Sequence, residues 1–347
     1  MPSKLLSEFI IKSLYHKWAH DNIKIYSVNR PNANQIIEQI IQETNNPDRQ
    51  YVIKVDQQIK GRMKKGLIKL NVNPNEMMSW IQTLDPHYQH FMIEPFEPNV
   101  ESESYVLIKN NHYGTDIMFL SKGGIDVGDM AQHNASKIFL EFGQEPQNED
   151  LIAIVGENSE LLDTIKKIYA FYQYYHLTFL EINPLAKLSA NTTGYQPLDM
   201  LAQYDSCSNY LWHPIDREFL EKNLQEDTNT TPEEKEIVAL GKKTGSSLKF
   251  ELLNPNSRVW FILFGGGASV CYFDQWTKTI QNQDPDLSAA NYGELSGNPS
   301  SDFVHQYTKQ IFSLMNKSKA PKPYYLVVGG GIANFTLVDQ TFKGIVQ

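Results

Sequence analysis

A basic, glycine-flanked stretch of this sequence has the residue types that bind phosphate. The segment "KVDQQIKGRMKKGLIKLN" begins at Lys54 and has glycines at positions 61 and 66. A flexible hairpin rich in cations can clamp nucleotide phosphates through charge-assisted hydrogen bonds. Its spacing differs from that of a P-loop, and a solvated basic loop is the structural alternative. The candidate cations are Lys54, Lys60, Arg62, Lys64 and Lys65.

A second group of polar side chains suits magnesium. The segments "FLEINPL" and "PLD" supply Glu181, Asn183 and Asp199. A carboxylate and an amide oxygen on neighbouring strands are hard ligands, and Mg²⁺ completes its shell with water and phosphate oxygens. Asn183 followed by Pro184 is also typical of a turn that ends a strand, so both interpretations stay open at this level.

Two runs of three glycines each follow an apolar run. "SRVWFILF" leads into Gly265–Gly267 and "YYLVV" leads into Gly329–Gly331, and a helical pattern follows each run. Glycine lets the backbone approach an anion, and a helix N-terminus supplies N–H donors and partial positive charge. Asn334 and Thr336 could add donors or cap the helix. The alternative is that the glycines only permit tight packing, but two matching turns favour an anion site. The spacing does not fit G-x-G-x-x-G, so NAD is not the indicated ligand.

Strands and helices must position these side chains, and the apolar patterns predict both. A first helix has Leu6, Ile10 and Leu14 on one face, and helical patterns recur at 73–84 and 159–175. The mixture predicts an α+β domain. Short β-rich runs lie at 50–56, 90–96, 104–110, 116–120 and 177–185.

The pattern changes in the second part of the chain. A polar stretch contains the helix-start signal Thr231-Pro232-Glu233-Glu234. Beyond it, strand, glycine turn and helix (beginning near Ala268 in the first case) occur in order twice, at 257–264 and at 324–328. This unit is typical of an open parallel α/β sheet. We therefore predict one domain over 1–238 and a second over 239–347.

Composition excludes several classes of function. The chain has 347 residues, 41% of them hydrophobic, and a net charge of −9, so it lacks the basic surface of a general nucleic-acid or membrane binder. Neither a secretory signal nor a membrane span is predicted. The cysteines, Cys207 and Cys271, form no metal or disulfide pattern, which favours a reducing compartment and a cytoplasmic protein. No histidine lies in a metal-ligand spacing.

Taken together, the motifs resemble one family. "IKGRMKKGL", "FMIEPFEP", "GGIDVGD", "FLEINPL", "LLNPNSRVW", "NYGELSGNPS" and "VVGGGIANFT" are similar to the ATP-grasp half of ATP-citrate lyase. That half is related to the β subunit of succinyl-CoA synthetase. The similarity runs from about Lys54 to the end of the sequence. "LLNPNSRVW", "NYGELSGNPS" and "GGGIANFT" are specific to the citrate lyase branch, whereas "EINPL" is shared with the synthetases.

The resemblance implies an ATP-grasp domain followed by a flavodoxin-like citrate-binding domain. ATP, with Mg²⁺, would phosphorylate a histidine on another half of the enzyme, and phosphate would pass to citrate. CoA, bound by that other half, would then yield citryl-CoA, which is cleaved to acetyl-CoA and oxaloacetate. The resemblance therefore implies a partner half carrying the phosphohistidine, the CoA site and the lyase module, and an oligomeric enzyme. No catalytic residue is expected in this chain, and we expect it to be inactive alone.

The resemblance also assigns binding residues by position. It places the nucleotide at Lys54, Arg62, Met63, Lys64 and Glu94, and magnesium at Asn183 and Asp199. The implied citrate site consists of Gly265, Gly266, Gly267, Ser296, Gly297, Gly331, Asn334, Phe335 and Thr336.

Departures from the family pattern leave alternatives open. Gly61, Arg62 and Met63 stand where the family has two arginines and a glycine, and Gly331 stands where serine is common. The sequence also stops before the family's citrate-binding arginine, so we expect the second domain to be truncated and its parallel sheet incomplete. One alternative is a citryl-CoA or succinyl-CoA synthetase-type ligase subunit. Another is a degenerate regulatory or binding subunit.

Overall fold

The chain forms two compact units. The structure is a computed structural model that describes residues 3–44, 49–57, 59, 61–124, 134–189, 194–224, 230–243, 245–331 and 337–347. Its contacts divide the chain into Met1–Gln225 and Glu226–Gln347. The division precedes helix α8 (Pro232–Lys243), whereas the predicted boundary at 238 lies inside that helix.

A large antiparallel sheet forms the greater part of the first unit. Its strand order is β1-β11-β9-β6-β7-β8, and the short strand β10 pairs with β9. Long strands such as β6 and β9 place polar side chains at several levels along one surface. The strands are β1 (Ser3–Leu6), β6 (Val100–Asn110), β7 (Gly114–Leu120), β8 (Ser136–Glu141), β9 (Leu177–Leu188), β10 (Tyr195–Pro197) and β11 (Met200–Asp205).

Helices cover one face of this sheet and form the largest core. Helix α1 begins after Ser7, whose side chain accepts a hydrogen bond from the N–H of Ile10, and α6 begins after Asn158 in the same way. Apolar residues of the helices, such as Ile165 and Phe171, pack against sheet residues such as Ile182. The helices are α1 (Glu8–Ala19), α5 (Asn148–Val155), α6 (Ser159–Tyr174) and α7 (Pro214–Asn223).

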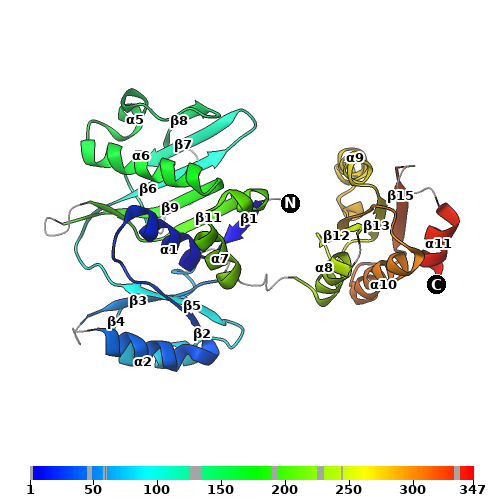
Figure 1. The fold of residues 1–347 in the computed structure, drawn as a ribbon, viewed down its shortest axis with the longest axis horizontal. Coiled ribbons are helices and arrows are strands. Elements are labelled where there is room, and N and C mark those ends of the chain that lie inside the picture. The colour runs from blue at the N-terminus through cyan, green and yellow to red at the C-terminus, as the bar shows by residue number, and fades with distance from the viewer. Residues whose placement is uncertain are drawn as a thin grey trace. The chain divides into compact units, whose positions relative to one another are not determined.

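A smaller antiparallel sheet with the order β2-β5-β3-β4 completes the first unit. Tyr51, Ile53 and Val55 on β3 pack with residues of α2 and α3 in a second core. Figure 1 shows α2 along the small sheet. Because side chains alternate along a strand, Lys54 points to the opposite face from Ile53. The elements are β2 (Tyr26–Asn29), α2 (Ala33–Glu43), β3 (Tyr51–Val55), β4 (Ile68–Val72), α3 (Pro74–Thr83) and β5 (His90–Pro95).

The second unit is a four-stranded sheet with helices on both faces. Its order is β12-β14-β13-β15; β13 runs parallel to β14 and β15, and β12 is antiparallel to β14. Helix α9 packs on one face, and α8, α10 and α11 pack on the other. The remaining elements are β12 (Ser247–Leu252), β13 (Val259–Phe264), α9 (Gly266–Trp276), β14 (Asn291–Ser296), α10 (Ser301–Lys317), β15 (Tyr325–Gly330) and α11 (Val338–Val346).

Most of the predicted elements are confirmed. Each predicted strand run contains a strand, and the helical patterns at 73–84 and 159–175 are α3 and α6. Thr231 and Glu234 exchange hydrogen bonds before α8, as the helix-start signal predicts. Among the described residues, no helix is both long and apolar enough to cross a bilayer.

Three details of the prediction are wrong. Leu6 ends strand β1 instead of lying in the first helix, although it is buried in the same core as Ile10 and Leu14. The sheet of the second unit is mixed, because β12 joins it antiparallel. Gly329 and Gly330 end strand β15 instead of forming a turn, since they pair with Leu263 and Phe264.

Candidate functional site

A buried cluster of charges lies where α1 meets β3 and β5. The ammonium group of Lys54 donates to Glu8 Oε1 at 2.6 Å, to Glu94 Oε1 at 2.7 Å and to the carbonyl oxygen of Leu198 at 2.6 Å. An ammonium group has three N–H donors, so these three acceptors use all of them. Lys54 and Glu94 are two of the predicted nucleotide residues, and the structure brings them into direct contact.

Lys12 repeats this pattern from the opposite side. Its ammonium group donates to Glu94 Oε2 at 2.6 Å and to the Leu198 carbonyl oxygen at 2.7 Å, and it lies 3.4 Å from Glu8 Oε1. The Lys12 side chain is 1% exposed and that of Glu8 is 2% exposed. Glu94 is therefore held between two lysines.

Arg62 extends the cluster to Asp199, which directly precedes β11. Its guanidinium contacts Glu8 Oε2 and donates to Asp199 Oδ1 at 2.9 Å and to the Val55 carbonyl oxygen at 3.0 Å. It lies in the turn between β3 and β4, where Gly61 and Gly66 both have positive φ. That conformation suits glycine, so the glycines of the basic hairpin serve the turn. Met63 and Lys64 lie in the same turn.

The electrostatics of the cluster follow from these contacts. Burial alone would raise the pKa of Glu8, but the charges of Lys54 and Arg62 hold it well below its usual range. Burial alone would lower the pKa of Lys54, but Glu8 and Glu94 raise it above its usual range. Both groups are therefore charged at neutral pH. Burial, followed by the charge of Glu8, raises the pKa of Asp56 to about 6.

The predicted magnesium ligands lie side by side. The backbone N–H of Asn183 donates to the carbonyl oxygen of Asp199 at 3.1 Å, because β9 and the segment before β11 run antiparallel. The Asn183 side chain binds the backbone of Gly124, accepting from its N–H at 2.8 Å and donating to its carbonyl oxygen at 3.3 Å. Glu181 lies elsewhere on β9 and accepts from the hydroxyl of Tyr105 at 2.9 Å.

These residues could bind magnesium through two protein ligands, and they do not form a coordination shell made entirely of protein atoms. Within the described ranges, no group of three or more histidine, cysteine, aspartate or glutamate side chains has the arrangement of a metal site. Mg²⁺ commonly binds through one or two protein oxygens together with water and phosphates. The Arg62 contact uses one carboxylate oxygen of Asp199, and each oxygen of a carboxylate or amide has more than one lone pair.

In the second unit, the first glycine run and the segment after β14 lie together. Gly265 has positive φ, and its N–H donates to the carbonyl oxygen of Leu295 at 2.7 Å. Ser296 and Gly297 follow Leu295, and Gly297 also has positive φ. The structure therefore places Gly265–Gly267 beside Ser296 and Gly297, at the carboxyl ends of parallel strands.

The connections place a topological switch point at this edge. From β13 the chain passes through α9 to β14 on one side, and through α10 to β15 on the other side of β13. In open α/β sheets, ligands bind outside the carboxyl ends of strands at such a point. Gly331 lies there too, with its N–H bonded to the Phe264 carbonyl oxygen at 3.0 Å. Asn334, Phe335 and Thr336 lie outside the described residues.

One glycine of the second run, Gly330, is required for packing. A Cβ on Gly330 would lie 2.6 Å from the Cβ of Phe264, which side chains do not tolerate. A Cβ on Gly267 would meet nothing within 4 Å, and one on Gly266 would lie 3.5 Å from an oxygen of Glu294. The tight-packing alternative is therefore correct for Gly330. In the first run Gly265 is buried, Gly266 is half-buried and Gly267 is exposed.

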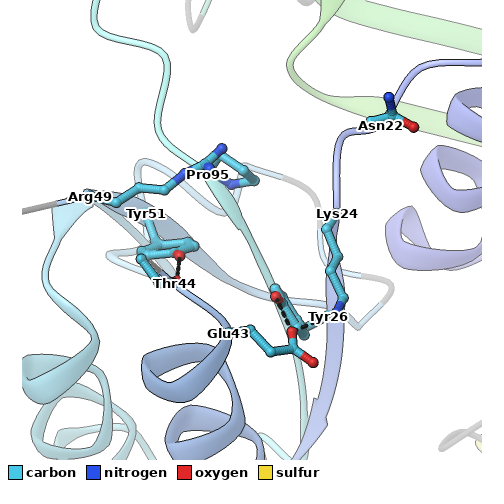
Figure 2. Close-up of a pocket in the computed structure, with 8 residues that line it drawn as sticks. All are labelled: Asn22, Lys24, Tyr26, Glu43, Thr44, Arg49, Tyr51 and Pro95. Carbon is cyan, nitrogen blue, oxygen red and sulfur yellow. Dashed lines mark hydrogen bonds and ion pairs between the residues drawn. The ribbon is translucent and has the colours of Figure 1, made fainter. Parts of the chain in front are cut away.

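A separate cavity of about 540 Å³ lies at the end of the small sheet (Figure 2). Its polar side chains largely bind one another: Glu43 accepts from Tyr26 at 2.9 Å and pairs with Lys24, and Thr44 bonds the hydroxyl of Tyr51 at 2.6 Å. None of its lining residues is a predicted site residue. These residues are Asn22, Lys24, Tyr26, Glu43, Thr44, Arg49, Tyr51 and Pro95.

Sequence reasoning missed Glu8 and Lys12. They lie four residues apart on α1, and opposite charges at this spacing usually mark a solvated helix face. The buried apolar residues Ile10 and Ile11 lie between them in the sequence. Two charged residues within an apolar helix face could have indicated that Glu8 and Lys12 are buried. This pattern does not identify the residues that they contact.

Family models match almost the whole chain. The model described as the ATP-citrate synthase ATP-grasp domain matches residues 3–214, and the model described as ATP citrate lyase citrate-binding matches residues 228–347. The chain belongs to the ATP-citrate synthase family. The ATP-grasp model covers the first unit with its two sheets, and the citrate-binding model covers the second unit.

Relatives in this family differ in length from the chain. It is 37% identical over 317 residues to the ATP-citrate synthase of Mus musculus, covering 85% of this chain and 28% of that protein. It is 31% identical to the probable ATP-citrate synthase subunit 2 of Schizosaccharomyces pombe, covering 85% of this chain and 68% of the relative. The chain thus spans about 28% of the mouse protein and most of the yeast subunit.

A solved structure of the ATP-citrate synthase family has the same fold. It is that of ATP citrate lyase from Methanothrix soehngenii in complex with citrate and coenzyme A. Its TM-score is 0.66 at 28% identity, covering 99% of this chain and 84% of that one. The predicted family and the predicted fold class, an ATP-grasp domain followed by an α/β domain, are confirmed.

Proposed function

We propose that this chain is the ATP- and citrate-binding part of an ATP-citrate lyase. The overall reaction would convert citrate, ATP and CoA into acetyl-CoA, oxaloacetate, ADP and phosphate. The family assignment supports this proposal, and the chain supplies two sites that suit the first chemical steps. One carboxylate of citrate must be activated before a thiol can displace an oxygen from it, which is the role of ATP.

The nucleotide site would lie at the charge cluster of the first unit. Lys54 and Arg62 would contact phosphate oxygens, since both are cations held close to Asp199. Met63 and Lys64 lie in the same turn as Arg62 and would lie next to the phosphates. Glu94 would lie beside the nucleotide and orient Lys54. Buried lysine and arginine side chains bind phosphate strongly when their geometry is fixed by neighbours.

Magnesium would be held by Asn183 and Asp199. When bound, the ion would neutralise phosphate charge and help orient the phosphate that is transferred. The chain's contribution is to hold the two oxygen ligands together, which the bond between the two backbones does. Arg62 contacts Asp199 from the nucleotide side and would keep its carboxylate oriented.

Citrate would bind at the switch point of the second unit. Gly266 and Gly267 present accessible backbone at the N-terminus of α9, which favours a carboxylate, and the buried Gly265 forms the turn before them. Ser296 and Gly297 lie beside them, and Gly331 lies at the end of β15. The proposed site also includes Asn334, Phe335 and Thr336.

Turnover would need a second half of the enzyme. That half would carry the phosphohistidine, the CoA site and the lyase module, and the yeast relative is named as a subunit. We propose that the isolated chain binds its ligands without completing the reaction, and that the working enzyme is an oligomer. A cytoplasmic location is part of the proposal, supported by the free cysteines Cys207 and Cys271.

The observation that carries the proposal is the contact of Lys54, Arg62 and Asp199 through one buried cluster in an ATP-grasp fold. Calorimetric titration of the chain tests it. MgATP should bind, and citrate should bind whereas succinate should not. Binding of succinate as tight as that of citrate would instead support a succinyl-CoA synthetase-type subunit. Absence of MgATP binding at millimolar concentration would reduce the chain to a non-catalytic module.

A further inference from the structure

Glu8 occupies the two cations that the proposed nucleotide phosphates need. Its Oε1 lies 2.6 Å from the ammonium of Lys54, and its Oε2 contacts the guanidinium of Arg62. A single carboxylate thus bridges the two cations in the way that two phosphate oxygens would. Because Lys54 has already used its three donors, a phosphate oxygen can bind it only by replacing one acceptor.

The cations of the cluster are already matched by carboxylates before any ligand binds. Lys12, Lys54 and Arg62 are the cations, and they contact the carboxylates of Glu8, Glu94 and Asp199. Polyphosphate added to this set creates an excess of negative charge in a buried place, which is strongly unfavourable unless an anion moves or a cation is added. Magnesium at Asp199 would offset part of that excess.

Among the three carboxylates, Glu8 is the one placed to move aside. Glu94 pairs with the two lysines and Asp199, a proposed magnesium ligand, pairs with Arg62. Glu8 bridges Lys54 and Arg62, so its movement would free both cations. Glu8 has a further cation one helical turn away, Lys12, at 3.4 Å. Lys12 itself is fixed by Glu94 and by the Leu198 carbonyl oxygen, so it stays within reach.

The backbone of Glu8 is anchored independently of its side chain. The N–H groups of Glu8 and Phe9 donate to the two carboxylate oxygens of Asp56 at 2.8 and 3.3 Å. This contact ties the first turn of α1 to the residue that follows β3. The Glu8 carboxylate can therefore change partners by side-chain rotation while the helix stays in place.

We propose that Glu8 is an internal competitor for phosphate, which binds Lys54 and Arg62 and passes to Lys12 when nucleotide phosphates take those two cations. The inference rests on the proposed nucleotide site. Glu8 is then a residue that determines affinity, and Lys12 is a residue that positions Glu8. Substitution of Glu8 should lower the Kd for MgATP, and substitution of Lys12 should raise it.

Calorimetry on the full chain tests these signs. Glu8→Gln keeps the shape but removes the charge, so it should lower the Kd for MgATP about tenfold. Lys12→Met removes the alternative partner of Glu8 and should raise that Kd by a similar factor. The gain from Glu8→Gln should fall from ATP to ADP to AMP, because it comes from phosphate charge. The matched control is Glu38→Gln on the exposed face of α2, which makes the same change in net charge and should leave every Kd unchanged.

Equal or weaker MgATP binding by Glu8→Gln would overturn the proposal, as would a gain that is the same for AMP and ATP. Loss of affinity in both single variants would show that the pair acts only as a scaffold, and would also overturn it. If Glu8→Gln fails to fold, the comparison is made between Lys12→Met and the double variant, which should bind MgATP more tightly than Lys12→Met alone. Failure of the unsubstituted chain to bind MgATP would instead refute the proposed nucleotide site.

Discussion

The backbone N–H of Asn183 donates to the carbonyl oxygen of Asp199 across 3.1 Å, which fixes the two proposed magnesium ligands at adjacent positions. Their side chains have different partners: Asn183 binds the backbone of Gly124, and Asp199 contacts Arg62. The pair therefore links Gly124 to the charge cluster around Lys54. A ligand that binds Asp199 would therefore contact a residue that is connected both to Asn183 and to the charge cluster.

Removal of the Asp199 carboxylate should abolish the stabilisation that MgATP gives. For the unsubstituted chain, MgATP at 100 times its Kd should add about 2.7 kcal/mol to the free energy of unfolding. Asp199→Ala removes a metal ligand and the Arg62 contact, so the melting temperature should no longer respond to MgATP. Asp163→Ala, on the exposed face of α6, should keep the full response. An undiminished response in Asp199→Ala would exclude this residue from the site.

The sequence was sufficient to locate most strands and the polar residues that lie in them or next to them. Runs such as 50–56 and 177–185 are β-rich and were predicted as strands. Lys54 and Asn183 lie in these runs, and Asp199 lies in the motif "PLD" that follows the second run. Asn183 and Asp199 meet because β9 and β11 pair antiparallel in the large sheet, and Glu8 and Arg62 connect Lys54 of the small sheet to Asp199. The motifs are consistent with that pairing, but they do not predict it, because it depends on contacts between residues that are distant in sequence.

The buried role of α1 could not be predicted in the same way. Glu8 and Lys12 show an ordinary helical spacing, and their burial arises only because β3 and β5 supply Lys54 and Glu94. The second glycine run was also misjudged, since Gly330 is required by its neighbour Phe264 on the paired strand. Local sequence gives no sign of either contact, because both partners are far away along the chain.

Truncation of Asn291 should destabilise the second unit. Its side chain is fully buried, and it accepts from the N–H of Phe261 and donates to the Phe261 carbonyl oxygen, both at 2.9 Å. It thus replaces backbone bonds between β13 and β14. Asn291→Ala leaves both buried groups without these partners, and we expect a loss of about 3 kcal/mol in the free energy of unfolding. Denaturation with urea measures it, and the exposed Asn282→Ala should change stability by no more than about 0.5 kcal/mol.

Two glycines of the second unit should respond oppositely to alanine. In Gly330→Ala the new methyl group would lie 2.6 Å from the Cβ of Phe264 and 2.7 Å from its carbonyl oxygen, so β13 and β15 must separate. We expect a loss of roughly 1–3 kcal/mol. Gly267→Ala adds a methyl group to α9 with no atom within 4 Å, and helix propensity should make it neutral or stabilising by up to about 1 kcal/mol. Similar losses in both variants would contradict this account of the packing.

Asp56 should make the stability of the first unit depend on pH. Burial and then the charge of Glu8 raise its pKa in the folded chain from 3.8 to about 6. Between these two values the folded chain binds more protons than the unfolded chain, so the contribution of Asp56 to stability falls as pH rises. Stabilisation from this group is present below pH 4 and is lost as pH passes 6.

The Asp56→Asn variant isolates this effect. Asparagine keeps an oxygen acceptor for the N–H of Glu8 but does not ionise. The free energy of unfolding of Asp56→Asn, relative to the unsubstituted chain, should therefore increase between pH 4 and pH 7 by an amount on the order of 3 kcal/mol. Urea denaturation at a series of pH values measures the difference, with the exposed Asp163→Asn as the control. A difference that stays constant across this range would show that Asp56 is already ionised at pH 4, and that the Asp56 bonds to α1 outweigh its burial.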